Sequence, residues 1–373
     1  MNNKKRWTEK SLVITLISIF MGFLVGAVIL SVAGYNPLQA YGVLFKGVFE
    51  KPKYISQTII NSTPLIITGL SVAFAFRTGL FNIGVEGQFI MGGLAAALVG
   101  YFVKLPPVIH VIAVILAAAL AAGLWGGIAG YLKAKSGVNE VITTIMLNWI
   151  AFYFQNFVLT FKAFKKPESE SSYDIQQTAS TILLEKWKQT AEGRDWLGNH
   201  PILKEIFKTD LNVGIIIAVA LIILVWFILR RTTLGYELRA VGSNKYASEY
   251  GGVNVKKSII ASMMIAGALA GTAGALHVMG VSHRVSTLAA MEGYGLDGIS
   301  VALIAGNSPI GCLFAGLLFG GLKYGGSKIQ QAMGAPSEII SIMIGTIVFF
   351  IAMPTLIRLA MTFISRKRGD ENA

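Results

Sequence analysis

The stretch Gly79-Leu80-Phe81-Asn82-Ile83-Gly84-Val85-Glu86-Gly87-Gln88 places a carboxylate, two amides and three glycines at the start of an apolar run that continues to Tyr101. A carboxylate at membrane depth costs roughly 3 kcal/mol on insertion scales. Such a group is expected to face the interior of a helix bundle or a watery path, and to avoid lipid. The stretch is therefore typical of a path for solutes through a membrane.

The composition agrees with a chain that lies in a lipid bilayer. Hydrophobic residues make up 54% of it, charged residues 14%, and the mean hydropathy is +0.63, outside the usual range for soluble domains. The net charge of +13 does not predict a nucleic-acid partner, because the basic residues form no stripe interleaved with aromatic residues.

The chain is predicted to be an all-α membrane protein with about ten transmembrane helices and a single transmembrane domain over residues 1–373. A helix needs about 20 residues to cross the bilayer core, so the eighth and ninth apolar segments are expected to be half-helices or tilted, extended spans. The ten segments are Ser11 to Ala33, Ile55 to Phe76, Leu80 to Tyr101, Val108 to Leu132, Val138 to Phe161, Val213 to Leu229, Ser258 to Met279, Leu296 to Gly306, Ile310 to Leu322 and Ser337 to Met361.

Lysine and arginine predict the orientation. With ten crossings and both termini cytoplasmic, the inside segments carry sixteen basic residues and the short outside segments seven, as the positive-inside rule requires. Residues 162–212 then form an external insertion, which holds eight basic and eight acidic residues. Two roles fit this insertion: docking of a partner, or lying on the outer leaflet. Residues 230–257 form a cytoplasmic loop.

An internal repeat is visible in the apolar segments. The run Ala122–Gly127 is echoed by Ala315–Gly321, and Asn139–Met146 by Ser337–Met343, in the same order. The repeat also pairs Glu86 with Asp297, more loosely. Under the ten-span topology the two halves run in opposite directions, which predicts an inverted repeat. Shared low complexity in small and apolar residues is the alternative.

Small residues spaced four apart predict close helix contacts. They are packing features and carry no chemistry. The pairs are Gly22 and Gly26, Gly123 and Gly127, Gly267 and Gly271, and Gly316 and Gly320.

Polar residues within the apolar segments are the candidates for a translocation pathway. Glu140 and Glu338 also fit simple helix N-termini, and the amides of Gln155 and Asn156 fit hydrogen bonds to neighbouring helices. His277 and His283 are expected to be structural, and no catalytic, cofactor or metal set is predicted. The pathway candidates are Asn82, Glu86, Gln88, Asn139, Glu140, Asn148 and Asp297.

No phosphate-cradling Gly-x-x-x-x-Gly-Lys-Ser/Thr motif is present, so the chain is not expected to hydrolyse ATP. The 230–257 loop mixes short helix-forming runs, glycine breaks and both charge signs. It fits a lever docked on a partner, and equally a solvated loop between helices.

The chain resembles the membrane permease subunits of bacterial ATP-binding-cassette importers that take up branched-chain amino acids, ribose-like sugars and nucleosides. Four blocks carry the resemblance, and the Asn-Ile-Gly-x-Glu-Gly-Gln and Val-Asn-Glu-Val forms look most like the nucleoside branch. The blocks are Leu80–Gln88, Val138–Asn148, the Leu238–Gly252 loop followed by Ala266–Gly271, and Gly295–Leu303.

The resemblance implies four features of the assembly in the bacterial cytoplasmic membrane: a permease dimer whose second chain is often different, cytoplasmic ATPase subunits, an extracellular substrate-binding lipoprotein, and no chemistry on the substrate. It makes the 230–257 loop a coupling loop. The candidate contacts with the ATPase are Glu237, Arg239, Gly242, Asn244, Glu249 and Gly251.

A nucleoside is the first expectation for the substrate, since amides suit a neutral hydrogen-bonding solute and Phe81 or Trp149 could stack on a base. A ribose-like sugar is the alternative. A proton-coupled secondary transporter would instead use Glu86 or Glu140 as a titrating relay. An intramembrane enzyme is disfavoured, because no nucleophile and base pair is present in the spans.

Overall fold

The computed structural model describes residues 2–353, with side chains from residue 17 onward. Every regular element in this range is a helix, apart from three isolated β-bridges. The all-α prediction is therefore confirmed for the described residues. The helices are α1 Asn2–Val32, α2 Pro37–Phe49, α3 Pro52–Phe76, α4 Val85–Phe102, α5 Pro107–Ser136, α6 Glu140–Val158, α7 Ala191–Gly198, α8 Pro201–Phe207, α9 Gly214–Arg231, α10 Thr233–Ser243, α11 Lys245–Tyr250, α12 Val255–His277, α13 Tyr294–Ile304, α14 Pro309–Met333 and α15 Ser337–Ala352.

Each of the ten predicted apolar segments corresponds to one long or apolar helix, with one difference in length. The eighth segment is short as expected, since α13 has 11 residues. The ninth is longer than its apolar run, because α14 continues for 25 residues through polar positions near its end. The last part of the tenth segment, 354–361, lies outside the described residues.

Six helices in the described range are long and apolar enough to cross a membrane: α3, α4, α5, α6, α9 and α12. The count rises to seven if α1 and α2 form one broken span, since they meet at an angle of 120°. The chain is therefore a multi-pass membrane protein.

The described residues divide into two compact units. Unit 1 combines the chain up to Lys51 with the chain from Gly321 onward. In it, α1 packs on α15, with Gly22 against the backbone of Ile347. Unit 2 is Pro52–Gly320 and contains the pathway and coupling candidates.

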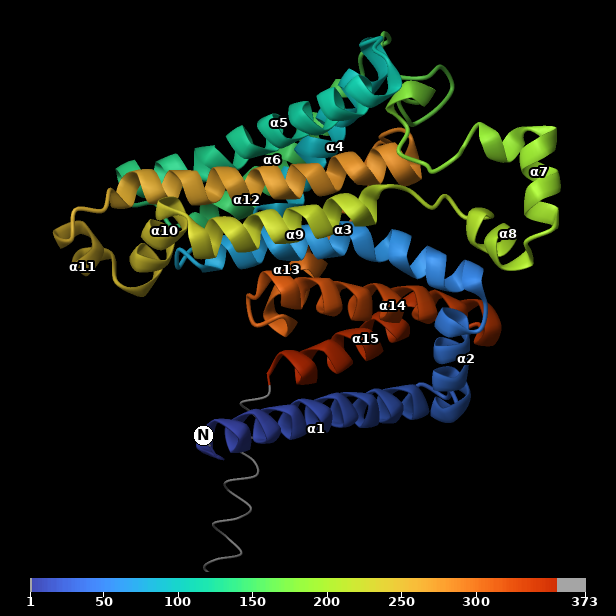
Figure 1. Ribbon diagram of the computed structural model, residues 1–373, viewed down its shortest axis with the longest axis horizontal. Coiled ribbons are helices and arrows are strands. Elements are labelled where there is room, and N and C mark those ends of the chain that lie inside the picture. Colours follow the sequence, from blue (N-terminus) through green and yellow to red (C-terminus); the bar gives the residue numbers. More distant parts are fainter. Residues whose placement is uncertain (1, 354–373) are drawn as a thin grey trace, which may run out of the picture. The chain divides into compact units, whose positions relative to one another are not determined.

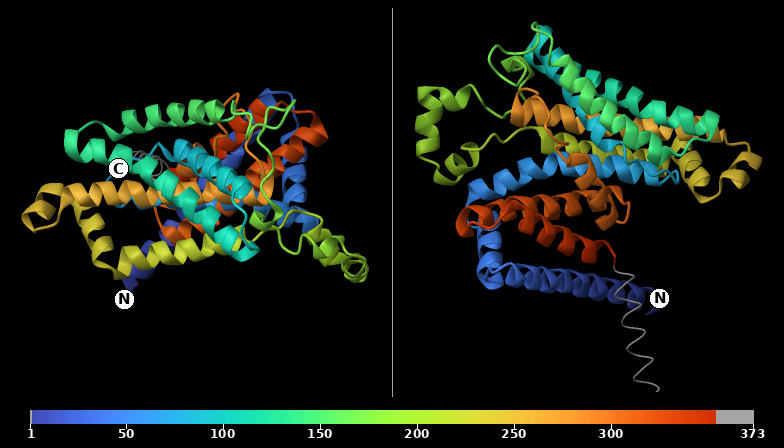
Figure 2. Two further views of the ribbon diagram at one scale, coloured as in Figure 1. Left: turned by 90° about the horizontal axis from the view of Figure 1, so that it is seen from above. Right: turned by 180° about the vertical axis from the view of Figure 1, so that it is seen from behind.

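Unit 2 has three central helices and three peripheral ones, which lie side by side in Figures 1 and 2. The most apolar windows of α3, α4 and α12 are 83%, 67% and 72% buried, whereas those of α5, α6 and α9 are 28% to 33% buried. A helix buried on one side only presents the rest of its apolar surface outward, as lipid-facing helices do. The central helices therefore form the buried interior of unit 2.

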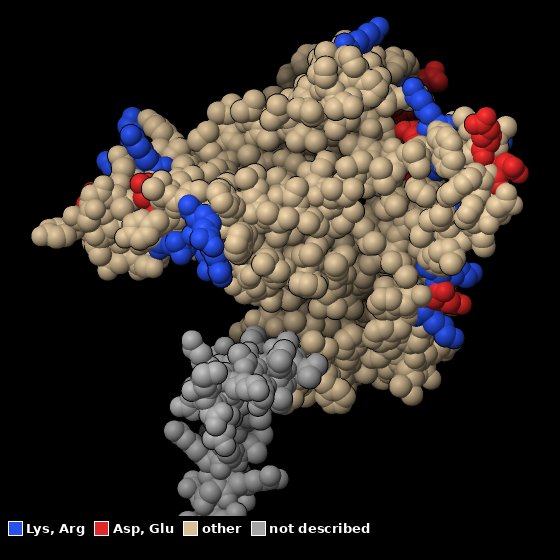
Figure 3. All heavy atoms as spheres, in the orientation of Figure 1, with Lys and Arg blue, Asp and Glu red and all other residues tan. Residues whose placement is uncertain are grey.

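Charged side chains gather at the two ends of unit 2. On the face shown in Figure 3 they lie over α10 and α11 at one end, and over α7, α8 and the loops next to the upper end of α5 at the other, while the broad surface between carries none. We call these the α10–α11 end and the α7–α8 end. A wide band without charge is the surface that a bilayer core requires.

Glycines set the distances between the helices of unit 2. Gly267 and Gly271 of α12 lie against the backbone of α5 at Ala122 and Ala118, and Gly123 of α5 lies against Met264. Gly271 also touches Gly92 of α4. The predicted glycine pairs are therefore confirmed as packing contacts.

A Gly92→Ala substitution tests this packing. An added Cβ would overlap the backbone of Gly271, which cannot move aside like a flexible side chain, so we expect a loss of about 1–3 kcal/mol. Thermal unfolding of the purified protein, followed by size-exclusion fluorescence, measures the loss. Gly345→Ala in α15 is the control, because nothing lies within 4 Å of its added Cβ. Equal unfolding temperatures for the two variants would contradict the close α4–α12 contact.

Candidate functional site

Glu86 joins the first turns of two helices. It lies in the first turn of α4, which begins at Val85, and its side chain is fully buried. The N–H of Gly293 donates to one carboxylate oxygen at 2.8 Å, and the N–H of Gly295 donates to the other at 2.6 Å. These residues are the N-cap and the second residue of α13. The carboxylate therefore lies at the positive N-terminal ends of both α4 and α13.

Two glycines make this contact possible. Gly293 has a φ of +84°, a conformation that L side chains rarely adopt. A Cβ at Gly295 would overlap the backbone of Glu86. The start of α13 can approach α4 this closely only because neither position carries a side chain.

Two of the predicted pathway amides bind each other. Asn82 donates to the Gln88 carbonyl oxygen at 2.9 Å, and Gln88 donates to the Asn82 carbonyl oxygen at 3.2 Å. The N–H of Gly84 also donates to Asn82, at 3.1 Å. Both amides are almost completely buried, so this reciprocal pair closes the turn that leads into α4.

Asn148 of α6 holds the same helix start from another side. The N–H of Gly87 donates to its side-chain oxygen at 2.8 Å, and its amide donates to the carbonyl of Ile83 at 3.0 Å. Asn82, Glu86, Gln88 and Asn148 are therefore brought together around the beginning of α4.

The remaining pathway candidates lie at other helix starts. Asn139 is the N-cap of α6 and accepts from the N–H of Val141 at 2.9 Å. Glu140 forms an ion pair with Lys133 at 2.6 Å. Asp297 is half-buried in the first turn of α13, the helix that Glu86 caps.

Two amide side chains of α6 form hydrogen bonds with a loop, whereas the sequence predicts hydrogen bonds with neighbouring helices. Gln155 donates to the carbonyl of Ser286 at 3.0 Å. Asn156 donates to the carbonyl of Leu288 at 3.0 Å and accepts from its N–H at 2.8 Å. Segment 283–293, which leads into α13, is thereby fixed against α6.

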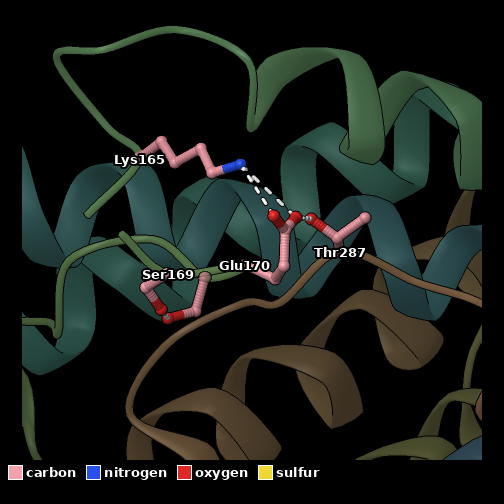
Figure 4. Close-up of polar contacts among 5 residues, drawn as sticks. Lys165, Ser169, Glu170 and Thr287 are labelled. Carbon is pink, nitrogen blue, oxygen red and sulfur yellow. Dashed lines mark hydrogen bonds and ion pairs between the residues drawn. The ribbon is translucent and has the colours of Figure 1, made fainter. Parts of the chain in front are cut away.

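The first part of the 162–212 insertion is paired with the same segment (Figure 4). Lys165 donates to both carboxylate oxygens of Glu170 at 3.3 Å, and the Thr287 hydroxyl donates to Glu170 at 3.1 Å. These hydrogen bonds, with Lys165 the larger cause, lower the pKa of Glu170. The backbone N–H of Thr287 adds a bond to the Glu170 carbonyl at 2.7 Å.

The coupling candidates occupy α10 and α11. Asn244 caps α11 by accepting from the N–H groups of Tyr246 and Ala247 at 3.0 Å, and Gly251 is its C-cap. Arg239 and Glu249 are exposed, and Glu237 is half-buried. Three tyrosines of these helices are exposed by 63% to 98%: Tyr236, Tyr246 and Tyr250.

Gly242 links α10 to the turn between α3 and α4. It lies against the carbonyl of Arg77 and the backbone of Gly79. The Arg77 guanidinium in turn donates to the carbonyl of Asn307 at 2.7 Å, just beyond the end of α13. The sequence identified Arg77 only as an inside charge, because the partner is 230 residues away in the chain.

Glu86→Gln tests the joint between α4 and α13. The amide keeps one acceptor oxygen but turns a donor toward the other backbone N–H, which costs about 1–3 kcal/mol for a buried donor without a partner. We expect faster hydrogen exchange over residues 289–299, and a larger loss of transport than of expression. Glu338→Gln, in the exposed first turn of α15, should cost only about 0.3–1 kcal/mol. Unchanged exchange in Glu86→Gln would show that the carboxylate does not hold α13.

Comparison with known proteins identifies the family of this chain. Residues 54–353 match the family described as branched-chain amino acid transport system / permease component. The guanosine ABC transporter permease protein NupP of Bacillus subtilis is 41% identical over 96% of this chain and 98% of its own. The nucleoside ABC transporter permease protein NupB of Lactococcus lactis is 36% identical over 97% and 95%.

The glucose ABC transporter permease protein TsgB13 of Haloferax volcanii is 30% identical over 90% of this chain and 86% of its own. No solved structure shows a significant match. The long family match and the near full-length relatives agree with the helical bundle and the motif blocks. The chain belongs to this family of ABC transporter permease subunits, which are membrane components of transport systems and are not enzymes themselves.

Proposed function

We propose that the chain is the permease subunit of an ABC importer that carries nucleosides across the bacterial cytoplasmic membrane. The observation that carries this proposal is its near full-length similarity to two permeases named for guanosine and nucleoside transport. The glucose permease is a more distant relative, which supports a sugar importer less well.

We further propose ten crossings, in which segment 283–293 and α13 together make the eighth. Eleven helical residues rise only about 17 Å, against a bilayer core of about 30 Å, so α13 is too short to cross alone. A discontinuous span is tolerated where its free backbone groups find protein partners. Glu86, Gln155 and Asn156 supply such partners on both sides of this break.

An inverted repeat is supported by exchanged contacts between the two halves. Gly123 and Gly127 of α5 lie against α12 at Met264, whereas Gly316 and Gly320 of α14 lie against α3 at Ile66 and Ser62. The sequence repeat pairs α5 with α14. Each of these helices therefore packs on the second span of the other half, as a two-fold axis in the membrane plane requires.

A second pair of contacts follows the same rule. Gly271 of α12 lies against Gly92 of α4, and Gly69 of α3 lies against Val301 of α13. Under the repeat, α3 corresponds to α12 and α4 to α13. Glu86 and Asp297 are then equivalent first-turn carboxylates, as the sequence pairing predicts.

We assign the α10–α11 end to the cytoplasm, together with both termini, because it collects the inside basic residues of unit 2. The α7–α8 end is then external, and its mixed charges make it a candidate surface for the substrate-binding lipoprotein. A second permease chain, as in the resembling importers, would complete the membrane pathway. In this pathway, the candidate residues of α4, α6 and α13 hold the first turns of α4 and α13 in place.

Coupling to the ATPase subunit is proposed to use α10 and α11. Their exposed tyrosines and charges form a surface outside the bilayer. Because Gly242 touches the α3–α4 turn and Arg77 reaches the end of α13, a displacement of α10 has a direct route to the short helix.

Uptake measurements on the intact complex test which class of substrate it transports. With labelled nucleosides, ribose and glucose as a panel, we expect saturable nucleoside uptake that requires ATP and persists with a proton uncoupler at constant ATP. A complex without this chain is the control. Sugar uptake without nucleoside uptake would favour the sugar importer, and loss of uptake with the uncoupler at constant ATP would favour the secondary transporter.

Double substitution of Glu237 and Arg239 by Ala tests the coupling surface. We expect weaker co-purification of the ATPase and less substrate-stimulated hydrolysis, with unchanged thermal stability of the permease. The matched control removes one acid and one base from α8, Lys204 and Glu205, at the opposite end. Full uptake by the α10 variant would contradict the assignment.

A further inference from the structure

A pocket with a cavity volume of about 70 Å³ opens beside the joint between α4 and α13. Its walls come from α4, α6, α12 and residues 282–292, all within unit 2. The loop that forms one wall is the segment fixed by Gln155, Asn156 and the external insertion, so the pocket lies toward the α7–α8 end of that joint.

One wall of the pocket is aromatic. Phe89 of α4 and His277 of α12 line it, with ring centroids 5.9 Å apart. Tyr294, the first residue of α13, packs against both rings. Its ring centroid lies 5.1 Å from that of Phe89, in a stacked arrangement, and 4.9 Å from that of His277. Aromatic walls of this kind bind the flat faces and edges of planar rings.

His277 carries an unused hydrogen-bonding atom at this wall. Its Nδ1 is buried and has no partner among the described residues. Buried polar atoms are nearly always paired, so an unpaired ring nitrogen beside a cavity points to a ligand as its partner. A neutral imidazole offers a donor or an acceptor at Nδ1 according to its tautomer, which suits the edge of a nucleobase.

The lining of the pocket also includes a carboxylate. Glu292 lines the pocket and is exposed, and no hydrogen bond or ion pair joins it to a described residue. Arg284, also in the wall, is paired with Asp174 at 3.6 Å. Glu292 is therefore available to accept hydrogen bonds from sugar hydroxyls.

We propose that this pocket binds the transported nucleoside inside the permease, with the base against Phe89 and His277 and the ribose toward Glu292. The proposal rests on the nucleoside function proposed above. It differs from the pathway candidates of the sequence, which are occupied by hydrogen bonds to helix starts. Tyr294, the first residue of α13, connects the Glu86 joint to the aromatic wall through its contacts with Phe89 and His277.

Cysteine protection in the intact complex tests the pocket. In a Cys312→Ala background, Glu292→Cys is labelled with a small polar maleimide during ATP turnover, with guanosine, adenosine or ribose present. We expect the nucleosides to suppress labelling and ribose at equal concentration to leave it unchanged. Ala290→Cys, exposed on the same segment but outside the pocket lining, is the matched control and should be labelled equally in all cases. Ser286→Cys, also in the pocket wall, replaces Glu292→Cys if that variant does not assemble.

A second substitution identifies the role of the ring nitrogen. His277→Leu, added to the cysteine variant, should raise the nucleoside concentration needed for protection by about tenfold, whereas His277→Asn should restore part of it. Equal protection by ribose and nucleoside, or labelling at 292 and 286 that no nucleoside changes, would overturn the pocket assignment if the wild-type complex takes up that nucleoside. A wild-type complex that takes up no nucleoside would instead overturn the proposed function.

Discussion

A helix that begins within a bilayer needs acceptors for its first N–H groups, because hydrocarbon offers none. Under the proposed ten crossings α13 is such a helix, and the carboxylate of Glu86 accepts from two of its first N–H groups. Two charge-assisted bonds of about 1.5–3 kcal/mol each offset the cost of burying the carboxylate. The position of α13, the loop before it and the pocket beside it all depend on this joint.

The start of α4 is satisfied in the same way by side chains. The side-chain oxygen of Asn148 accepts a hydrogen bond from the N–H of Gly87, and that of Asn82 accepts one from the N–H of Gly84. The polar side chains at the start of this apolar run therefore form hydrogen bonds with backbone groups. Their buried hydrogen bonds leave these side chains few free atoms to bind a solute. They can therefore act in a pathway only if the helix starts that they hold move.

The sequence predicted the apolar helices well, because each needs one long run of apolar residues and the membrane dictates the length. It also predicted the glycine contacts, whose spacing alone places them on one helix face. Three features were not predictable in this way. The extension of α14 continues through polar residues, the partners of Gln155 and Asn156 lie about 130 residues away, and the wall of Phe89, His277 and Tyr294 assembles from three separate helices. A lone histidine gives no local signal, and only its unpaired nitrogen beside a cavity distinguishes it from a structural one.

Residues 77–86, which form the link between α3 and α4 and the first two residues of α4, contact both ends of α13. Glu86 binds its first turn, and Arg77 binds the carbonyl of Asn307 just after its last turn. The same link lies against Gly242 of α10. A short helix held at both ends by one segment follows that segment as a rigid piece, because bending it would break some of its few internal hydrogen bonds. Under the proposed function, a push on α10 from an ATPase subunit would therefore reach Tyr294 and the pocket wall through one turn and one short helix, without any change in the packed glycine contacts of α12.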